Sequence, residues 1–344
     1  MKQNIVDEAL KERFLLQNEY LGDNKPVNRI TPLVSVTVAT YQHVDYIKQC
    51  LEGVLMQKTN FPYEIIVGED GSVDGTQDIC KEYAEKYPDK IRLYIRDRKL
   101  SQFVAENGEV TRFNGIWNRM SARGKYIAWC EGDDYWIDPL KLQKQVEFLE
   151  NHTDYSMCFH SALLKWEKGE YPDSIFYRVK GREYYGTEIF KRWIVATASV
   201  VFRKSVLDSD IYEKVLHEKR FIYGDNPLFL CAAKLGRIYG MKEVMSVYRK
   251  HEGGAVFFHD IKRELKTNIH DIAVYEVFGE EYKRVAMNKI CKRNIYNYLI
   301  LNENGRGKYR YLLQDAFKRN WLFSCVYYFY VLLKYNKKLK SCVV

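Results

Sequence analysis

The sequence contains no apolar run as long as the roughly 18 residues of a membrane-spanning helix, and its amino end lacks the apolar segment of a secretory signal. We therefore expect neither a transmembrane segment nor a targeting peptide. The eight cysteines are scattered without a C-x-x-C pair, which favours reduced thiols in a cytoplasmic protein over a disulfide framework. The patterns G-x-x-x-x-G-K-S/T and G-x-G-x-x-G are also absent, which excludes a P-loop and a dinucleotide fingerprint.

What the chain does have is the composition of a globular protein. Hydrophobic residues make up 47% and charged residues 29% of its 344 residues, enough for one large α/β domain with an appendage or for two domains. The formal net charge of +9 suggests an acidic partner, such as nucleic acid, anionic lipid or a phosphorylated substrate. The basic residues are spread along the chain and form no recognition motif, so we expect no nucleic-acid partner.

Short apolar runs alternate with helical patterns in the first half of the chain. This alternation predicts a mainly parallel sheet with right-handed crossovers, flanked by helices. The predicted strands are Leu33–Ala39, Tyr63–Val67, Ile91–Ile95 and Tyr126–Cys130, and the predicted helices are Val44–Leu55, Thr76–Tyr87, 112–122 and Leu140–Asn151, the last with Asp138 as N-cap and Pro139 as first helical residue.

An acidic group follows the fourth predicted strand. Glu131, Asp133 and Asp134 lie next to Gly132, which allows a tight turn. Carboxylates so close together repel one another, and a fold keeps them where a cation or a catalytic role requires them. The alternative is an ordinary acidic turn before a helix.

A second acidic loop, Gly68–Thr76, follows the second predicted strand and contains Asp70 and Asp74. Alone it is typical of a Gly/Asp turn. Together the two loops lie at the carboxyl ends of strands of one sheet, where open α/β folds bind ligands. Such a crevice suits a nucleotide, with carboxylates for the base and ribose and a divalent cation for the phosphates.

Three segments, Pro32–Tyr41, Glu64–Thr76 and Gly124–Asp134, resemble a family 2 glycosyltransferase of the GT-A fold, of the bacterial polysaccharide type. The resemblance covers roughly residues 32–255. It implies that Thr40, Tyr41 and Asp70 contact the base and ribose. It also implies that Glu131-Gly132-Asp133 is the D-x-D element that binds the nucleotide sugar, with Glu in place of the first Asp. Our first choice of metal ligand is Asp133, with Asp134 nearby.

The same resemblance implies roles for three residues further along the chain. Asp225 precedes an apolar helix that runs to about Leu235, where the family has its general base; its alternative role is an N-cap. Arg249 and His251 lie in a segment similar to the family's YRxHxGG pattern, near the diphosphate and acceptor. The alternative for His251 is an ordinary loop histidine, but Arg249 and two glycines beside it favour phosphate contact or metal ligation.

We expect three regions: an N-terminal helical extension over residues 1–30, a GT-A domain over 31–255 and a helical C-terminal region over 256–344. The apolar, aromatic segment Trp321–Leu333 lies between Lys318-Arg319 and four more lysines, Lys334, Lys337, Lys338 and Lys340. Its composition predicts contact with an anionic membrane without crossing it. The alternative is packing on the catalytic domain or on a second subunit of a homo-oligomer.

The predicted function is that of a metal-dependent inverting glycosyltransferase, using Mg²⁺ or Mn²⁺. It would move a sugar from a nucleotide-sugar donor to a saccharide or lipid-linked saccharide hydroxyl in cell-surface polysaccharide synthesis. The location would be the cytoplasm, at the inner face of the cell membrane. The alternatives are a sugar nucleotidyltransferase and a catalytically inactive nucleotide-sugar-binding module.

Overall fold

A computed structural model of the chain describes residues 10–22, 28–104, 110–169, 171–254, 261–301 and 309–341. The chain forms two compact units that interleave along the sequence. The first unit comprises Met1–Tyr185, Trp193–Glu213 and Cys231–Phe257, and the second comprises Gly186–Arg192, Lys214–Leu230 and Phe258–Val344. The boundaries at residues 30 and 255 expected from the sequence stay predictions.

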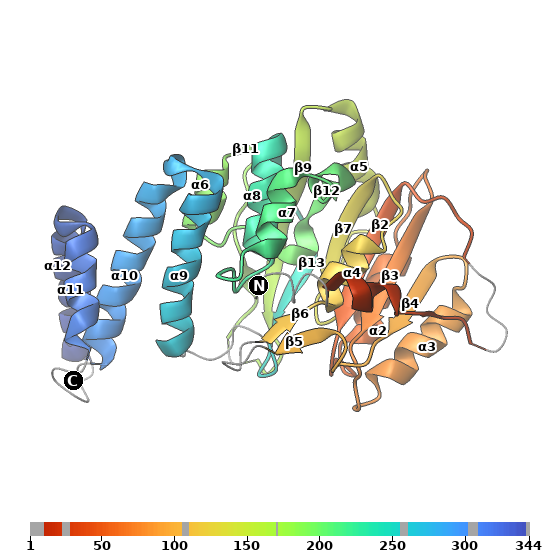
Figure 1. Cartoon of the computed structure of the whole chain (residues 1–344), viewed down its shortest axis with the longest axis horizontal. Coiled ribbons are helices and arrows are strands. Elements are labelled where there is room, and N and C mark those ends of the chain that lie inside the picture. The colour runs from red at the N-terminus through yellow and green to blue at the C-terminus, as the bar shows by residue number, and fades with distance from the viewer. Residues whose placement is uncertain are drawn as a thin grey trace. The chain divides into compact units, whose positions relative to one another are not determined.

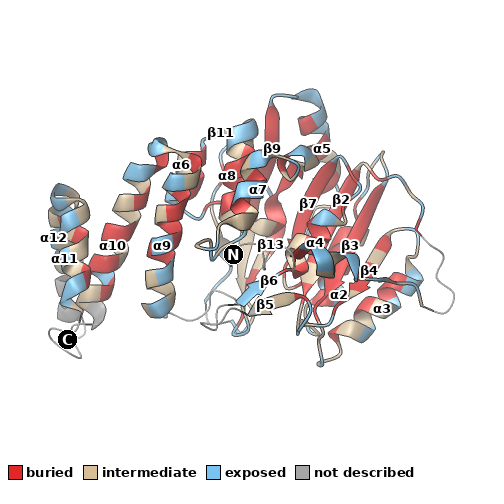
Figure 2. Ribbon diagram, in the orientation of Figure 1, coloured by how far each residue is buried: buried red, intermediate tan, exposed pale blue. Residues whose placement is uncertain are grey.

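The first unit is built on one large mixed sheet with the strand order β1-β4-β3-β2-β7-β12-β9-β13-β11 (Figure 1). Its four central strands are parallel neighbours and confirm the predicted strands: β2 Val34–Thr40, β3 Tyr63–Glu69, β4 Ile91–Ile95 and β7 Tyr126–Glu131. β2 and β3 are almost wholly buried, as expected for strands covered on both faces (Figure 2).

The rest of the sheet contains both parallel and reversed strands. β12 (Val201–Arg203) is antiparallel to both β7 and β9 (Tyr155–Trp166), and β9 is parallel to β13 (Arg237–Lys250). The shorter strands are β1 Glu19–Tyr20, β8 Tyr135–Trp136, β10 Ser174–Ile175 and β11 Arg182–Tyr184. β5 (Gln102–Val104) and β6 (Val110–Arg112) form a separate hairpin. The fold is therefore the predicted mainly parallel α/β sheet.

Helices cover both faces of this sheet. Side chains of α2 (Ile47–Leu55), α3 (Thr76–Lys86) and α5 (Lys141–Asn151) share one apolar core with β2, β3 and β7. On the other face, α4 (Asn114–Met120) places amide side chains of Asn114 and Asn118 on the carbonyl oxygens of Gly68 and Val38, respectively. Each of these helices begins within three residues of its predicted start.

The predicted cap of α5 is wrong in position. The helix begins at Lys141 with Leu140 as its N-cap. Asp138 instead accepts the backbone N–H of Leu140 at 2.8 Å and pairs with Lys144 at 2.6 Å, closing the turn that precedes the helix. Pro139 lies in this turn and not in the helix.

Near the amino end, residues 10–15 are helical, whereas most of the predicted amphipathic helix lies outside the described residues. Leu10 packs on Phe113 and Trp117. Two short 3-10 helices, η1 (Thr197–Ser199) and η2 (Lys204–Val206), flank β12.

The second unit is helical, as the sequence predicts for the C-terminal region. Its helices include α6 Gly186–Lys191, α9 Ile261–Phe278, η3 Glu280–Tyr282, α10 Lys283–Leu301, α11 Arg310–Arg319 and α12 Trp321–Ser341. α10 contacts α9, α11 and α12, and a small core forms around Cys291, Ile295 and Ala316. The division between the units falls within α7 (Asp210–His217) and α8 (Asp225–Leu235). Within the described ranges, every helix is too short or too polar to cross a membrane.

Candidate functional site

The loops that follow β2 and β7 lie against each other because these strands are parallel neighbours, with Ala39 paired to Glu131. The Gly132 N–H donates to the carbonyl oxygen of Ala39 at 2.9 Å. A Cβ atom at Gly132 would lie 2.7 Å from the Thr40 side chain and 2.9 Å from Nδ1 of His43. Only glycine permits this close approach, so Gly132 brings the acidic loop up to the Thr40–His43 loop.

Three side chains of the types that ligate metals meet at this edge of the sheet, and we call them the metal-binding group. Nε2 of His251 lies 3.0 Å from Oδ2 of Asp133, and Nε2 of His43 lies 4.0 Å from the same oxygen. One ligand atom from each of the three residues lies within 4.8 Å of the others. The sequence patterns point to Asp133 and His251 but not to His43. Its position directly after a strand at the same sheet edge is the signal that could have found it.

The protonation states of this group suit a cation. Burial lowers the pKa of His43 below its usual value, against the opposing effect of Asp133, so the imidazole is neutral near pH 7. Burial alone would raise the pKa of Asp133, but its hydrogen bond with His251 and the nearby His43 hold it below the usual value. A carboxylate and two imidazole nitrogens are an ordinary donor set for a divalent transition metal, so the residues fit the cation that the family resemblance implies.

Arg249 ties the acidic loop to β13. Its backbone N–H donates to Oδ1 of Asp134 at 2.9 Å, and its guanidinium donates to the carbonyl oxygen of Asp133 at 2.6 Å and to Glu167 at 2.8 Å. The same guanidinium also hydrogen-bonds Gln49 of α2. With only 4% of its surface exposed, Arg249 holds the loop in place. Its predicted contact with the donor diphosphate stays a prediction.

Asp134 lies outside the metal-binding group. It is buried, and its Oδ2 atom has no hydrogen-bond partner among the described residues. Burial and the neighbouring Asp133 raise its pKa well above the usual value, which disfavours the ionised form that a metal ligand needs. The geometry therefore supports Asp133 and His251 as ligands more strongly than Asp134, whose ligation stays a prediction.

Asp70 and Tyr41 lie at the carboxyl ends of β3 and β2. Asp70 is buried, pairs with Arg98 at 2.6 Å and hydrogen-bonds Ser101. The Arg98 guanidinium lies 3.4 Å from the centre of the Tyr41 ring. Asp70, Tyr41 and Thr40 are thus close together, since the Asp70 N–H donates to the carbonyl oxygen of Thr40 at 3.1 Å.

Two acidic residues of these loops have local partners. Asp74 accepts backbone N–H groups from Thr76 at 3.0 Å and Val44 at 3.1 Å, so it closes the turn before α3 and anchors the loop that carries His43. For Asp74 the ordinary turn role described above is sufficient. Glu131 accepts the indole N–H of Trp129 at 2.7 Å and is half-buried.

Asp225 is the first residue of α8, at the predicted start of that helix. Its carboxylate accepts the N–H of Asn226 at 2.8 Å. It belongs to the second unit, whereas the metal-binding group belongs to the first. Its role as general base stays a prediction.

The parallel sheet, the loops at its carboxyl edge and the helices on both faces define a glycosyltransferase fold of the GT-A type. Residues 35–210 match the sequence model described as Glycosyl transferase family 2, which covers half of the chain. The chain belongs to this family.

The chain is similar to an uncharacterized protein of Mycobacterium tuberculosis, 34% identical over 222 residues that cover 64% of this chain and 60% of the relative. It thus spans about three fifths of that relative's length. It is also similar to the putative teichuronic acid biosynthesis glycosyltransferase TuaG of Bacillus subtilis, 28% identical over 63% of this chain and 79% of TuaG. The mannosyltransferase PcManGT of Pyrobaculum calidifontis, solved with GDP-Man and Mn²⁺, shares the fold at a TM-score of 0.51 and 16% identity, over 97% of this chain and 94% of that chain.

Proposed function

We propose that this chain transfers a sugar, with inversion, from a nucleotide-sugar donor to a hydroxyl of a saccharide or lipid-linked saccharide during synthesis of a cell-surface polysaccharide. The observation that carries the proposal is the group formed by Asp133, His251 and His43 beside Thr40 at the carboxyl edge of the sheet. Membership of family 2 and the similarity to TuaG support the reaction class and the kind of product.

The residues of the first unit would bind the donor. Asp70 and Thr40 offer oxygen atoms for the base and ribose, and the Tyr41 ring offers a flat apolar face. Asp133 and His251 would hold Mg²⁺ or Mn²⁺, which when bound neutralises the charge of a leaving diphosphate. Arg249 keeps the acidic loop against β13, so these groups keep their positions while substrates exchange.

In the second unit, Asp225 would act as the general base. It takes the proton of the acceptor hydroxyl while that oxygen forms a bond to the anomeric carbon. The bond from the anomeric carbon to the diphosphate oxygen breaks in the same step, and the nucleoside diphosphate leaves. One displacement at the anomeric carbon inverts its configuration.

Substitution of Asp225 by Asn tests this role. We expect sugar transfer to fall by about 10²–10⁴-fold, the usual contribution of a general base, while binding of a nucleoside diphosphate with Mn²⁺ is retained. Asp210→Asn is the matched control, because Asp210 is also acidic and in the first turn of its helix. Turnover like that of the unchanged protein in Asp225→Asn would refute the role. Release of pyrophosphate from a nucleoside triphosphate and a sugar phosphate would instead indicate a nucleotidyltransferase.

A thermal-shift panel tests the donor site independently. Nucleoside diphosphates with and without Mn²⁺ are compared, since a ligand that binds the folded state raises the melting temperature by mass action. We expect at least one nucleotide to stabilise the protein in a metal-dependent way. No response to any nucleotide would refute the donor-site assignment.

We further propose that α12 brings the enzyme to an anionic membrane face, where a lipid-linked acceptor would be met. Six apolar side chains of this helix are at least 56% exposed: Trp321, Leu322, Val326, Phe329, Tyr330 and Leu333. α12 has no acidic residue, and α11 ends in Lys318 and Arg319. Each such cation adds about 1 kcal/mol of attraction to an acidic leaflet. The side chains of Lys337, Lys338 and Lys340 lie outside the described residues.

Flotation with vesicles tests this surface. The full chain should float with phosphatidylglycerol vesicles at low salt but not with phosphatidylcholine vesicles. Replacing Trp321 and Phe329 by Ser should abolish flotation, whereas Leu15→Ser, at a residue 81% exposed in the other unit, should not. If the α12 variant floats as well as the unchanged protein, α12 does not contact the membrane. If the substitutions instead change a dimer into a monomer, a second subunit covers this face of α12.

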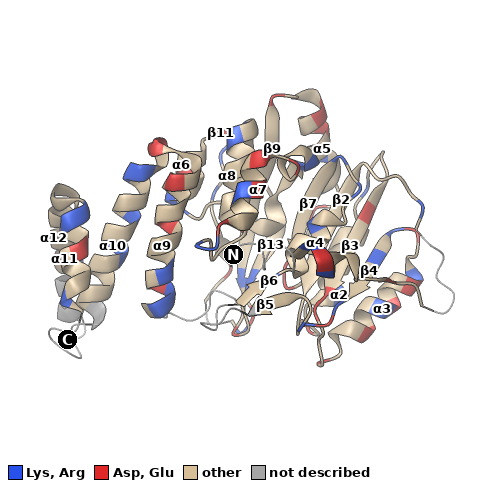
Figure 3. Cartoon of the chain, in the orientation of Figure 1, with Lys and Arg blue, Asp and Glu red and all other residues tan. Residues whose placement is uncertain are grey.

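In Figure 3, the Lys and Arg residues of the described segments are spread over several elements, among them α3, α7, α9 and α10. The expectation that the net positive charge does not mark a nucleic-acid surface stays a prediction.

A further inference from the structure

We propose that His43, Asp133 and His251 form a preorganised three-ligand site that binds a first-row transition-metal ion, such as Mn²⁺ or Co²⁺, before the nucleotide sugar and in preference to Mg²⁺. This inference rests on the proposed function but adds a third ligand, an order of binding and a metal preference. Each follows from a separate observation at the site.

The first observation is the spacing of the donor atoms. Donors about 2.1 Å from one ion lie about 3.0 Å apart when adjacent and at most about 4.2 Å apart when opposite. Nε2 of His251 lies 3.0 Å from Oδ2 of Asp133, the distance expected for adjacent ligands. Nε2 of His43 lies 4.0 Å from the same oxygen, close to the distance expected for opposite ligands. One ion at this oxygen can therefore be bound by both histidines with little movement of the backbone.

The second observation is that groups around His43 aim its Nε2 atom. Nδ1 of His43 lies 3.2 Å from Oγ1 of Thr40, a partner that fixes the ring when Nδ1 carries the proton. The backbone N–H of His43 donates to Thr76 at 2.8 Å, and Thr76 is in turn bound by Asp74. Such outer partners are what orient metal-binding histidines and select their free nitrogen.

The third observation is that His251 and Asp133 are equally well supported. The His251 ring, 8% exposed, lies 4.6 Å from the ring of Tyr46, measured between centres. The carbonyl oxygen of Asp133 is held by Arg249. Since contacts within the chain position all three ligands, metal binding does not have to wait for the diphosphate oxygens.

The donor set decides the preference. Mg²⁺ favours an all-oxygen octahedron with several waters, and Mn²⁺ also accepts oxygen ligands. Imidazole nitrogen binds first-row ions with an affinity that rises from Mn²⁺ to Co²⁺, so two histidines favour these ions over Mg²⁺. Two nitrogens and one carboxylate oxygen leave open positions that diphosphate oxygens or water can fill. A carboxylate such as Asp133 does not by itself favour first-row ions over Mg²⁺. The preference for these ions therefore comes from the imidazoles of His43 and His251.

The test uses the full chain, stripped with a chelator and titrated with MnCl₂, CoCl₂ or MgCl₂ without nucleotide. Isothermal calorimetry measures all three ions, and electron paramagnetic resonance counts free Mn²⁺. We expect one Mn²⁺ per chain, tighter binding of Co²⁺ and no measurable binding of Mg²⁺. His43→Ala should weaken Mn²⁺ binding at least about tenfold, and Thr40→Val should weaken it about 10-fold through loss of the ring's partner.

His152→Ala is the control, because His152 is exposed on the end of α5 and unconnected with the site. His43→Asn provides a second variant that keeps a donor oxygen; we expect it to narrow the preference for Mn²⁺ over Mg²⁺. Equal affinity for Mg²⁺ and Mn²⁺, or unchanged Mn²⁺ binding in both His43 variants, overturns the proposal. Metal binding without sugar transfer would support the three-ligand site and refute the proposed function. Sugar transfer that is unaffected by the His43 variants and equally active with Mg²⁺ would support the proposed function and refute the three-ligand site.

Discussion

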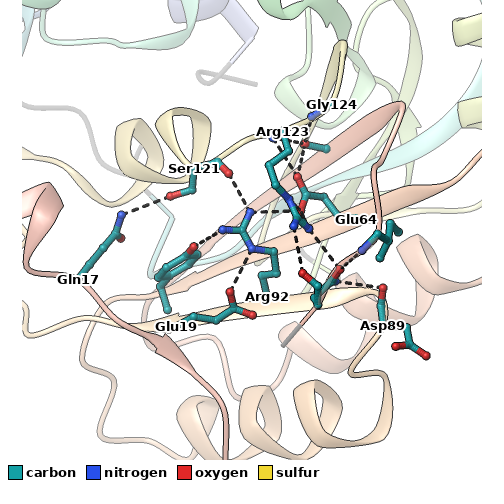
Figure 4. A network of polar contacts seen from close by, with 12 residues as sticks. Gln17, Glu19, Glu64, Asp89, Arg92, Ser121, Arg123 and Gly124 are labelled. Atoms are coloured by element: carbon teal, nitrogen blue, oxygen red, sulfur yellow. Dashed lines mark hydrogen bonds and ion pairs between the residues drawn. The ribbon is translucent and has the colours of Figure 1, made fainter. Parts of the chain in front are cut away.

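Two acidic clusters lie at opposite ends of the parallel strands of the sheet, and their partners differ. Glu64, near the start of β3, is fully buried. Its carboxylate accepts hydrogen bonds from Arg123 at 2.6 and 2.9 Å, Arg92 at 3.2 Å and the Ser35 hydroxyl at 2.6 Å (Figure 4). Its charge is matched by two guanidinium groups, so this cluster has no place for another cation.

The cluster at the carboxyl ends is different because imidazoles replace the guanidinium groups. Asp133 meets His251 and His43, while the guanidinium of Arg249 contacts its carbonyl oxygen and not its carboxylate. An imidazole lacks the permanent charge of a guanidinium. Breaking the pairing of a buried carboxylate with arginines is costly to a fold, whereas a half-buried carboxylate beside two imidazoles is suited to bind a cation.

Removing the charge of Glu64 should have the largest effect on stability. Glu64→Gln removes the carboxylate that pairs with Arg123 at 2.6 Å, whereas Arg92 keeps its pair with Glu19 at 3.2 Å. Loss of one partner of a buried pair costs about 3–5 kcal/mol. Urea unfolding measures the change, with Mn²⁺ binding of the folded fraction expected to be normal. The control is Glu150→Gln, which removes an exposed pair with Lys125 and should cost less than about 1 kcal/mol. If Glu64→Gln and Glu150→Gln lower the free energy of unfolding equally, the Glu64 cluster has no special structural role and the contrast with the Asp133 cluster is wrong.

At the other end of the strands the same substitution should act on binding. Asp133→Asn should weaken Mn²⁺ binding by about 100-fold, equivalent to about 2.7 kcal/mol, because the one charged ligand is lost. Its free energy of unfolding should change by less than about 1 kcal/mol, since no cationic side chain loses its partner. Calorimetric titration and urea unfolding of one preparation give both numbers. A stability loss as large as that of Glu64→Gln would show that Asp133 is a structural residue.

Lys141 extends the comparison to a buried cation without a carboxylate. Its Nζ atom donates to Gln145 at 2.8 Å and lies 4.0 Å from the centre of the Trp136 ring. Burial lowers its pKa to about 7, against the opposing effects of Cys130 and Cys158.

Because this pKa is lower in the folded state than in the unfolded chain, the unfolded chain holds an extra proton between about pH 7 and 10, and stability should rise with pH across that window. Lys141→Met should remove this slope and stabilise the protein by about 2 kcal/mol at pH 7. Urea unfolding at pH 7 and pH 9.5 measures both effects. A variant that is less stable than the natural chain at pH 7 contradicts the expectation.

The sequence was sufficient for the central fold. β2, β3, β4 and β7 are rich in apolar and β-branched residues, and their alternation with helices predicts a parallel sheet. The reversed strand β12 has three residues, and β8 has two. Strands this short carry no periodic pattern, and distant partners on β9 and β13 determine their direction.

The candidate site could be predicted only in part, because some of its residues lie in recognisable local patterns and others do not. Asp133 lies in an acidic group that is unusual after an apolar strand, and His251 lies beside Arg249 and two glycines. His43 has no such neighbours, and only the register of β2 against β7 brings it to Asp133. Asp74 looked equivalent to Asp70 in sequence, but its hydrogen bonds with Val44 and Thr76 show an anchoring role that depends on local geometry.

The contact between Asp133 and His251 joins residues 118 positions apart, and Arg249 completes the same loop. During synthesis at about 5–20 residues per second, about 6–24 s separate the emergence of these two residues from the ribosome. The nascent chain must therefore carry the acidic loop without its restraints during that interval. A ribosome-bound fragment ending near residue 210 would contain the whole segment that matches the family and still lack two of the side chains that shape the proposed metal site.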